Sequence, residues 1–143
     1  DVYDESDSYF SLSSTPSWAT LFIQSGDQGN QWHYDETIDL SAYAGYTITF
    51  RFYGETGSGY KSDMAIDNIR LYDDGFLEDT ESFESSSSWL YDNVTGDDSD
   101  WTRGYDTPSN GTGPSSASSG TYYMFTEATS QYNEDFFLDQ YLR

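Results

Sequence analysis

The chain has 143 residues, of which 26 are acidic and 5 are basic, and its formal net charge is −21. Binding to nucleic acid or to an anionic membrane needs clusters of Lys and Arg, so this charge argues against both partners. The sequence has no cysteine, which excludes disulfide bridges, Cys-ligated zinc and thiol nucleophiles. An aromatic content of 19% predicts a folded core of large rings, which is typical of β-sheets.

Apolar runs and turn residues alternate along the first half of the chain. Residues 1–17 are acidic and rich in serine, and only Val2-Tyr3 has the composition of a strand end. The clearest strand is 46–53, where one set of aromatic and aliphatic side chains alternates with a second, more polar set. We expect strands at 18–23, 32–40, 46–53 and 64–72, separated by loops or turns at 25–30, 41–45, 54–59 and 73–75.

The second half follows a predicted linker or crossover at 76–81. Residues 104–120 are mainly Gly, Pro, Ser and Thr and predict a long surface loop. No stretch has helical periodicity, and no apolar run approaches the length of a transmembrane helix. We therefore expect one domain over 1–143, an all-β jelly-roll sandwich of antiparallel strands, with the remaining strands at 89–93, 121–128 and 135–142.

An acidic loop precedes Trp101. Three carboxylates lie within 97–100, and like charges so close together repel one another. A hard cation such as Ca²⁺, which takes six to eight oxygen ligands, would offset this repulsion. The spacing does not match an EF-hand, so a calcium site would draw ligands from separate loops. The alternative is a solvated acidic loop with no bound ion.

The second half resembles the opening of a MAM domain, the extracellular adhesion module named after meprin, the A5 antigen and receptor phosphatase mu. Several motifs appear in the family's order and with family-like spacing. They are Ser82-Phe83-Glu84, Trp89, the run from Gly96 through Asp97-Asp98-Ser99-Asp100 to Trp101-Thr102-Arg103, Thr107-Pro108-Ser109, Thr112-Gly113-Pro114, Gly120-Thr121-Tyr122-Tyr123 and Glu127-Ala128.

The first half is similar to the closing part of the same family. Residues 1–75 thus resemble the C-terminal half of a MAM domain and residues 76–143 its N-terminal half. The matching pieces are the runs at 18–22 and 25–32, Ile38-Asp39-Leu40, Tyr43-Ala44-Gly45, Phe50-Arg51-Phe52 and the run from Asp63 through Ala65-Ile66-Asp67-Asn68 to Ile69.

The order of the two halves is the reverse of the family's order. The family's usual cysteines are absent, and a strand pair expected between the halves is missing or reduced. Three interpretations fit: a circular permutant, one period of a tandem array taken off register, or a subunit that completes its sandwich with a neighbour's strand.

The resemblance implies an extracellular location, secreted or at the cell surface. Some members of the family hold a structural cation, and oxygen ligands without His or Cys favour Ca²⁺. Asp67 lies between Ile66 and Ile69, where a carboxylate is costly unless it is bonded or binds a metal. The positions matched to the family's cation site are Glu84, Asp98, Asp100 and Asp67.

Aromatic residues suggest a second kind of site. The four tryptophans are expected mainly in the core, but exposed rings on a β-sandwich can stack on sugars. Tyr60, Tyr105, Tyr122 and Tyr123 are the candidates for such stacking. Asn93 and Asn110 match the N-glycosylation pattern, which arises easily by chance in a chain rich in Ser and Thr.

These patterns favour an extracellular adhesion or assembly module that contacts other protein modules or copies of itself and is stabilised by structural calcium. The alternative is a carbohydrate-binding module of a secreted polysaccharide-active enzyme. Catalysis by the domain itself is not expected. His33 is the only histidine and is interpreted as an ordinary strand residue, and the carboxylates are too numerous for any pair to stand out.

Overall fold

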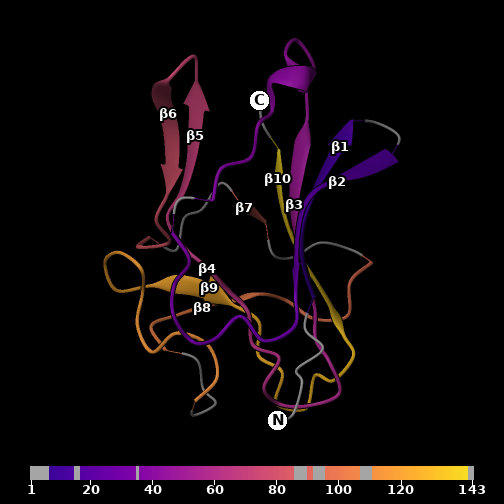
Figure 1. The fold of residues 1–143 in the computed structure, drawn as a ribbon, viewed down its shortest axis with the longest axis vertical. Coiled ribbons are helices and arrows are strands. Elements are labelled where there is room, and N and C mark those ends of the chain that lie inside the picture. Colours follow the sequence, from indigo (N-terminus) through magenta and orange to yellow (C-terminus); the bar gives the residue numbers. More distant parts are fainter. Residues whose placement is uncertain are drawn as a thin grey trace.

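The computed structural model describes residues 7–14, 17–34, 36–85, 90–91, 96–106 and 111–141. Regular structure in these residues consists of β-strands and one turn of 3-10 helix, so the all-β prediction is confirmed. Among the described residues, no helix has the length and apolar composition needed to cross a membrane. The elements in Figure 1 are β1 (Asp7–Ser14), β2 (Ser17–Ser25), η1 (Ser41–Tyr43), β3 (Thr49–Glu55), β4 (Ala65–Ile66), β5 (Ile69–Asp73), β6 (Phe76–Glu81), β7 (Leu90–Tyr91), β8 (Thr102–Gly104), β9 (Tyr123–Phe125) and β10 (Asp135–Tyr141).

The described strands form three sheets, and every ladder between them is antiparallel. A five-stranded sheet has the order β2-β1-β3-β10-β7, a three-stranded sheet has the order β4-β9-β8, and β5 pairs with β6. β3 and β4 come from residues 1–75, whereas their partners β10 and β9 come from residues 76–143. The two halves therefore build the five-stranded and three-stranded sheets together. The jelly-roll connection of the strands stays a prediction.

The hairpin of β5 and β6 stands apart from the five-stranded sheet, at the upper left of Figure 1. Its turn is Asp74-Gly75, with φ of 49° and 81°. A two-residue type I′ turn needs a positive φ at both positions, and Asp-Gly is one of its favoured sequences. Asn68, with φ of 53°, separates β4 from β5. The predicted strand 64–72 is thus two strands in two different sheets.

Alternation along β3 sorts its side chains onto two faces. Phe50 is buried and Phe52 packs beside it, whereas Arg51 and Tyr53 lie on the opposite face. The principal core cluster joins side chains of β10 to those of β9, and each fully buried large side chain contributes roughly 1.5–3 kcal/mol. Its buried members are Met64, Phe83, Trp101, Met124, Phe136 and Leu138.

A second hydrophobic cluster has fewer buried side chains than the first. Only Ile48 and Phe50 are buried in it, and the hydrophobic residues around them are partly buried. The core is therefore closed at the three-stranded sheet and open at the end of the molecule that carries the hairpin.

Three sequence predictions about strands are wrong. Residues 32–34 and 36–40 form a loop, residues 76–81 form β6 rather than a linker or crossover, and β1 lies within the serine-rich stretch 1–17. Ile38 and Leu40 pack against Ile48 and Phe50 from this loop, whereas Tyr34 is exposed. Trp32 packs edge-on against Tyr123, and its indole Nε1 donates to Ser116 O at 2.8 Å.

Candidate functional site

A large cleft separates the hairpin from the inner face of the five-stranded sheet. We call it the inner cleft; it is bordered by residues from 22–53, 61–78 and 111–119, together with Trp101. Its volume is about 2600 Å³. Small-molecule sites usually occupy roughly 300–1,000 Å³. The size of the inner cleft therefore suits a segment of polypeptide better than a small ligand.

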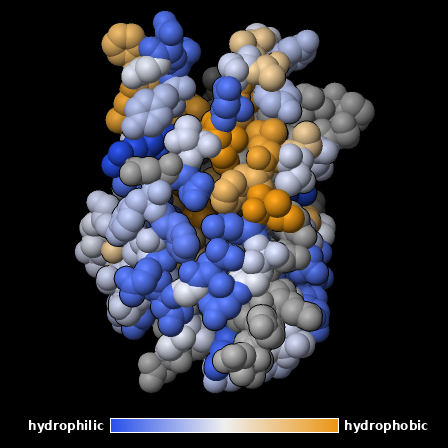
Figure 2. All heavy atoms as spheres, in the orientation of Figure 1, coloured by the Kyte–Doolittle hydropathy of each residue, from blue (hydrophilic) through white to orange (hydrophobic). Residues whose placement is uncertain are grey.

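Apolar side chains form both walls of the inner cleft. Phe50 and Phe52 of β3 lie on one wall, and Ile69 and Leu71 of β5 lie on the other. Figure 2 shows apolar side chains gathered in the hollow between the hairpin and the five-stranded sheet. Sheets in a sandwich normally pack about 10 Å apart with interdigitated side chains. The volume of the inner cleft shows that its two walls do not pack against each other in this way.

Large rings also lie exposed at the margin of the inner cleft. Tyr46 is 71% exposed, and Tyr34 and Tyr72 are also mostly exposed. Contiguous apolar surface beyond a few hundred Å² is uncommon on monomeric proteins and marks interaction sites. These exposed tyrosine rings thus continue the apolar surface of the walls to the outside of the inner cleft.

The edge of β5 adds backbone groups to this surface. Among the described strands, β5 pairs only with β6, and its residues border the inner cleft. An unpaired strand edge presents N–H and C=O groups that can pair with another extended chain. The inner cleft therefore offers apolar side chains and hydrogen-bonding backbone together.

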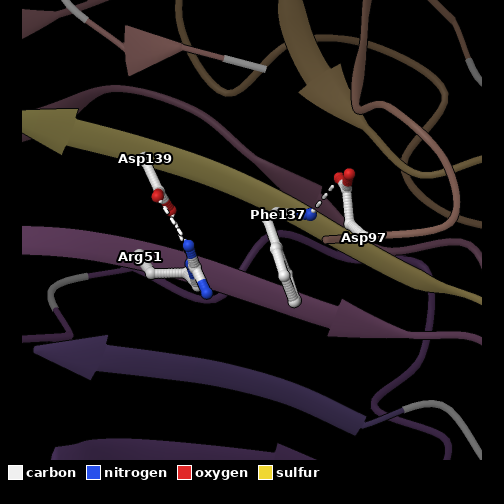
Figure 3. Close-up of polar contacts among 4 residues, drawn as sticks. All are labelled: Arg51, Asp97, Phe137 and Asp139. Atoms are coloured by element: carbon white, nitrogen blue, oxygen red, sulfur yellow. Dashed lines mark hydrogen bonds and ion pairs between the residues drawn. The ribbon is translucent and has the colours of Figure 1, made fainter. Parts of the chain in front are cut away.

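The acidic loop at 97–100 lies elsewhere, against the start of β10. Asp98 N donates to Asp135 O at 2.9 Å, and Asp135 N donates to Asp98 Oδ2 at 3.0 Å. Phe137 N donates to Asp97 Oδ2 at 2.9 Å (Figure 3). Burial raises the pKa of Asp97, as does the nearby Asp100 carboxylate, against the opposing effect of the Phe137 N–H. The side chains and backbone of this loop are thus hydrogen-bonded to the first residues of β10.

Glu84 and Asp67 meet at a different loop. Thr121 N and Tyr122 N donate to Glu84 Oε1 at 2.8 and 2.9 Å. Ser119 N donates to Asp67 Oδ2 at 3.1 Å, and Asn68 N donates to Asp67 Oδ1 at 2.7 Å. Two carboxylates from different parts of the chain thus hold 118–122 in place through backbone N–H groups.

The four predicted calcium ligands are not brought to one place. Asp67 and Glu84 are close enough to repel each other electrostatically, whereas Asp98 and Asp100 belong to the loop at β10. In the part of the chain that the structure describes, no three His, Cys, Asp or Glu residues are grouped to hold a metal. Calcium stays a prediction from the sequence.

The carboxyl of Asp67 gives a testable pH dependence. Burial raises its pKa above the ordinary 3.8, and the Glu84 charge raises it further, while the N–H groups of Ser119 and Asn68 oppose both. The folded state therefore binds this proton more tightly than the unfolded state. Protonation of Asp67 therefore contributes stability that is fully present below the ordinary pKa of 3.8 and is lost as the pH rises through the higher folded pKa.

We expect the wild type to gain stability relative to Asp67→Asn as the pH is lowered from about 7 to about 4. Asn cannot take up the proton, so the difference between the two proteins isolates this group. Urea denaturation of both proteins at several pH values measures the difference. A difference that is constant, or that moves the other way, contradicts the assignment.

The four tyrosines predicted to stack on sugars differ in exposure. Tyr60 and Tyr105 are exposed, but Tyr123 is 0% exposed and its hydroxyl donates to Pro114 O at 2.7 Å. The Tyr122 ring is only partly exposed and carries the Arg103 guanidinium 3.8 Å from its centroid. Tyr105 meets Tyr122 edge-on, so the two rings do not form a coplanar platform. Tyr123 belongs to the core and is unable to stack on a ligand from solvent.

Other predicted residues have ordinary surroundings or are not described. Of the tryptophans, Trp101 is buried whereas Trp18 is 42% exposed. His33 is an exposed loop residue whose Nε2 lies 3.0 Å from Gln28 O. The candidate glycosylation residues Asn93 and Asn110 lie outside the described residues, as does Trp89.

An ion pair that the sequence patterns did not indicate joins β3 to β10. Arg51 Nε and Nη2 donate to Asp139 Oδ1 and Oδ2, both at 2.7 Å (Figure 3). The guanidinium also stacks on the rings of Trp18 and Phe137, at 4.2 and 4.0 Å from their centroids. This cluster ties β2, β3 and β10 together on the face of the sheet opposite the core.

The inner cleft was likewise not predicted from composition or motifs. Its one sequence signal is the strand pair that the MAM resemblance leaves missing between the two halves. That resemblance stays a prediction from sequence motifs, because no protein-family model and no solved structure matches the chain.

Proposed function

We propose that this domain is a protein assembly module whose inner cleft receives an extended segment of a partner chain. The observation that carries the proposal is the cleft of about 2600 Å³ between β3 and the β5–β6 hairpin, which has apolar side chains on both of these walls. Burial of apolar surface provides most of the free energy of protein association. A segment between the two walls would cover side chains that are now only half-buried, such as Ile69 and Leu71.

The edge of β5 supports an extended partner rather than a helical one. A strand added to this edge would gain main-chain hydrogen bonds, while its alternate side chains would enter the apolar walls. The added segment would also place a strand beside the hairpin, where β5 has no second partner among the described strands. Assembly by strand addition is a common mode of recognition for sheets with an open edge.

The proposal is tested by selecting random ten-residue peptides on the wild-type domain, with counter-selection on Leu71→Ser. Leu71 is half-buried and borders the inner cleft, so its replacement removes apolar contact without adding charge. We expect enriched peptides to bind the wild type and Tyr105→Ser alike, and Leu71→Ser and Ile38→Ser at least about tenfold more weakly.

Tyr105 is the matched control because its ring is exposed and does not border the inner cleft. Ile38 gives a second, independent change on the side opposite β5. Circular dichroism and denaturant titration establish that each variant is folded before binding is compared. If no enriched peptide distinguishes the inner-cleft variants from Tyr105→Ser, the inner cleft is not the binding site.

A further inference from the structure

The rim of the inner cleft has a charge pattern that indicates the chemistry of its partner. Among the described residues that border it, eight are acidic and only two, Lys61 and Arg70, are basic. The acidic residues are Asp27, Glu36, Asp39, Asp63, Asp67, Asp73, Asp74 and Glu78. The apolar walls therefore lie inside a strongly negative rim.

Several of these carboxylates are exposed to solvent. Glu36 lies on the loop before η1, whereas Asp73, Asp74 and Glu78 lie on the hairpin, so the negative charge flanks the inner cleft on both sides. Asp39 is exposed and accepts a hydrogen bond from Ser41 N, and this hydrogen bond lowers the pKa of Asp39. The hydrogen bond from Ser41 N therefore favours the ionised form of Asp39.

We propose that the inner cleft binds an extended cationic segment of a partner protein, in which apolar residues alternate with Lys or Arg. This inference rests on the proposed function and names its partner class. Successive side chains of a strand point to opposite sides, so such a segment presents one apolar and one basic face. The apolar face would enter the walls, and the basic side chains would reach the acidic rim.

A second copy of this chain is the competing occupant, and its charge disfavours it. Each copy carries a net charge of −21, and the hairpin that it would insert carries Asp73, Asp74, Glu78 and Asp79. Acidic hairpins entering acidic clefts repel, and the repulsion weakens when salt shortens the Debye length to about 10 Å at 0.1 M. Association between copies would therefore strengthen with salt, whereas binding of a cationic segment would weaken.

The test uses three synthetic ten-residue peptides: alternating lysine and valine, alternating glutamate and valine, and alternating lysine and serine. Binding is measured by titration calorimetry in EDTA, so that no divalent cation bridges carboxylates. We expect the lysine–valine peptide to bind at least about tenfold more tightly than either of the others. Its affinity should fall several-fold between about 0.05 M and about 0.5 M salt.

Matched variants locate the charge effect. Glu36→Gln with Glu78→Gln removes two rim charges, and Asp100→Asn with Asp106→Asn removes two exposed charges that do not border the inner cleft. Both pairs change the net charge equally. We expect the rim pair to weaken the lysine–valine peptide about tenfold and the distant pair to change it less than about threefold.

Equal weakening by the two pairs, or equal affinity for the glutamate–valine peptide, overturns the inference. Self-association of the domain that strengthens with salt, seen by light scattering, also overturns it and assigns the inner cleft to a second copy. Neutral or acidic peptides that lose affinity in Leu71→Ser would retain the proposed function and reject only the cationic partner. If Leu71→Ser and Ile38→Ser bind every peptide as tightly as the wild type does, the proposed function itself is rejected.

Discussion

Replacing Asp139 with asparagine is expected to lower the free energy of unfolding by about 3 kcal/mol. The side chains of Arg51 and Asp139 are 16% and 5% exposed, so little water screens the pair. Removing one partner leaves the other charge uncompensated in a site between aromatic rings. The change keeps the shape of the side chain and removes its charge, so it isolates the electrostatic contribution.

Urea denaturation measures this loss, and a double variant provides the control. Replacing both residues of a buried pair with apolar residues is often close to neutral. Arg51→Met with Asp139→Leu should therefore recover most of the stability lost in Asp139→Asn. Asp100→Asn, at an exposed position, should change stability by less than about 0.5 kcal/mol. A loss in Asp139→Asn no larger than in Asp100→Asn would show that the pair is unimportant.

Gly120→Ala is expected to destabilise the domain by about 2–4 kcal/mol, of which the backbone conformation accounts for roughly 1–2 kcal/mol. Gly120 has φ of 71°, in the left-handed region that disfavours alanine. A Cβ at this position would also meet the Glu84 carboxylate, which accepts the N–H groups of Thr121 and Tyr122. The variant therefore displaces the carboxylate that holds the loop 118–122.

Gly75→Ala separates the two contributions. Gly75 has φ of 81°, and a Cβ there would meet nothing within 4 Å, so it reports the conformational cost alone. Denaturation of both variants should show a larger loss for Gly120→Ala, by roughly 1–2 kcal/mol. Equal losses would mean that the contact between Glu84 and the loop contributes nothing measurable.

Local patterns were sufficient to predict the strands that have one buried face. β3 alternates along Phe50, Arg51, Phe52 and Tyr53, and only the first and third of these side chains face the core. The strand at 135–142, which contains β10, was predicted from its aromatic and apolar residues rather than from alternation. β6 was missed because Glu78 and Asp79 give it the composition of a linker, and it is exposed along most of its length.

Side-chain partners far apart in the sequence could not be predicted. Arg51 and Asp139 are 88 residues apart, and only the register of β3 against β10 brings them together. The carboxylates of 97–100 were expected at a cation because their mutual repulsion was evident. The backbone N–H groups of β10 that bond to Asp97 and Asp98 have no sequence signal. The amino-acid composition therefore indicates where carboxylates cluster, but it does not indicate which N–H groups bond to them.

The inner cleft illustrates the same limit at the level of sheets. Ile69 and Leu71 have the pattern of a buried strand, yet β5 pairs only with β6 among the described strands and leaves its inner side open. Sequence patterns indicate which side chains are apolar. They do not indicate whether the chain itself provides enough strands to cover them.

Amide hydrogen exchange of the domain, with and without a peptide selected on it, tests the inner cleft most directly. If the inner cleft is the binding site, the peptide slows exchange in β5 and near Ile48, which directly precedes β3. Exchange near Tyr105, which does not border the inner cleft, should be unchanged. Protection confined to the region of Tyr105 or to the face carrying Trp18, with β5 unaffected, would show that the peptide binds outside the inner cleft.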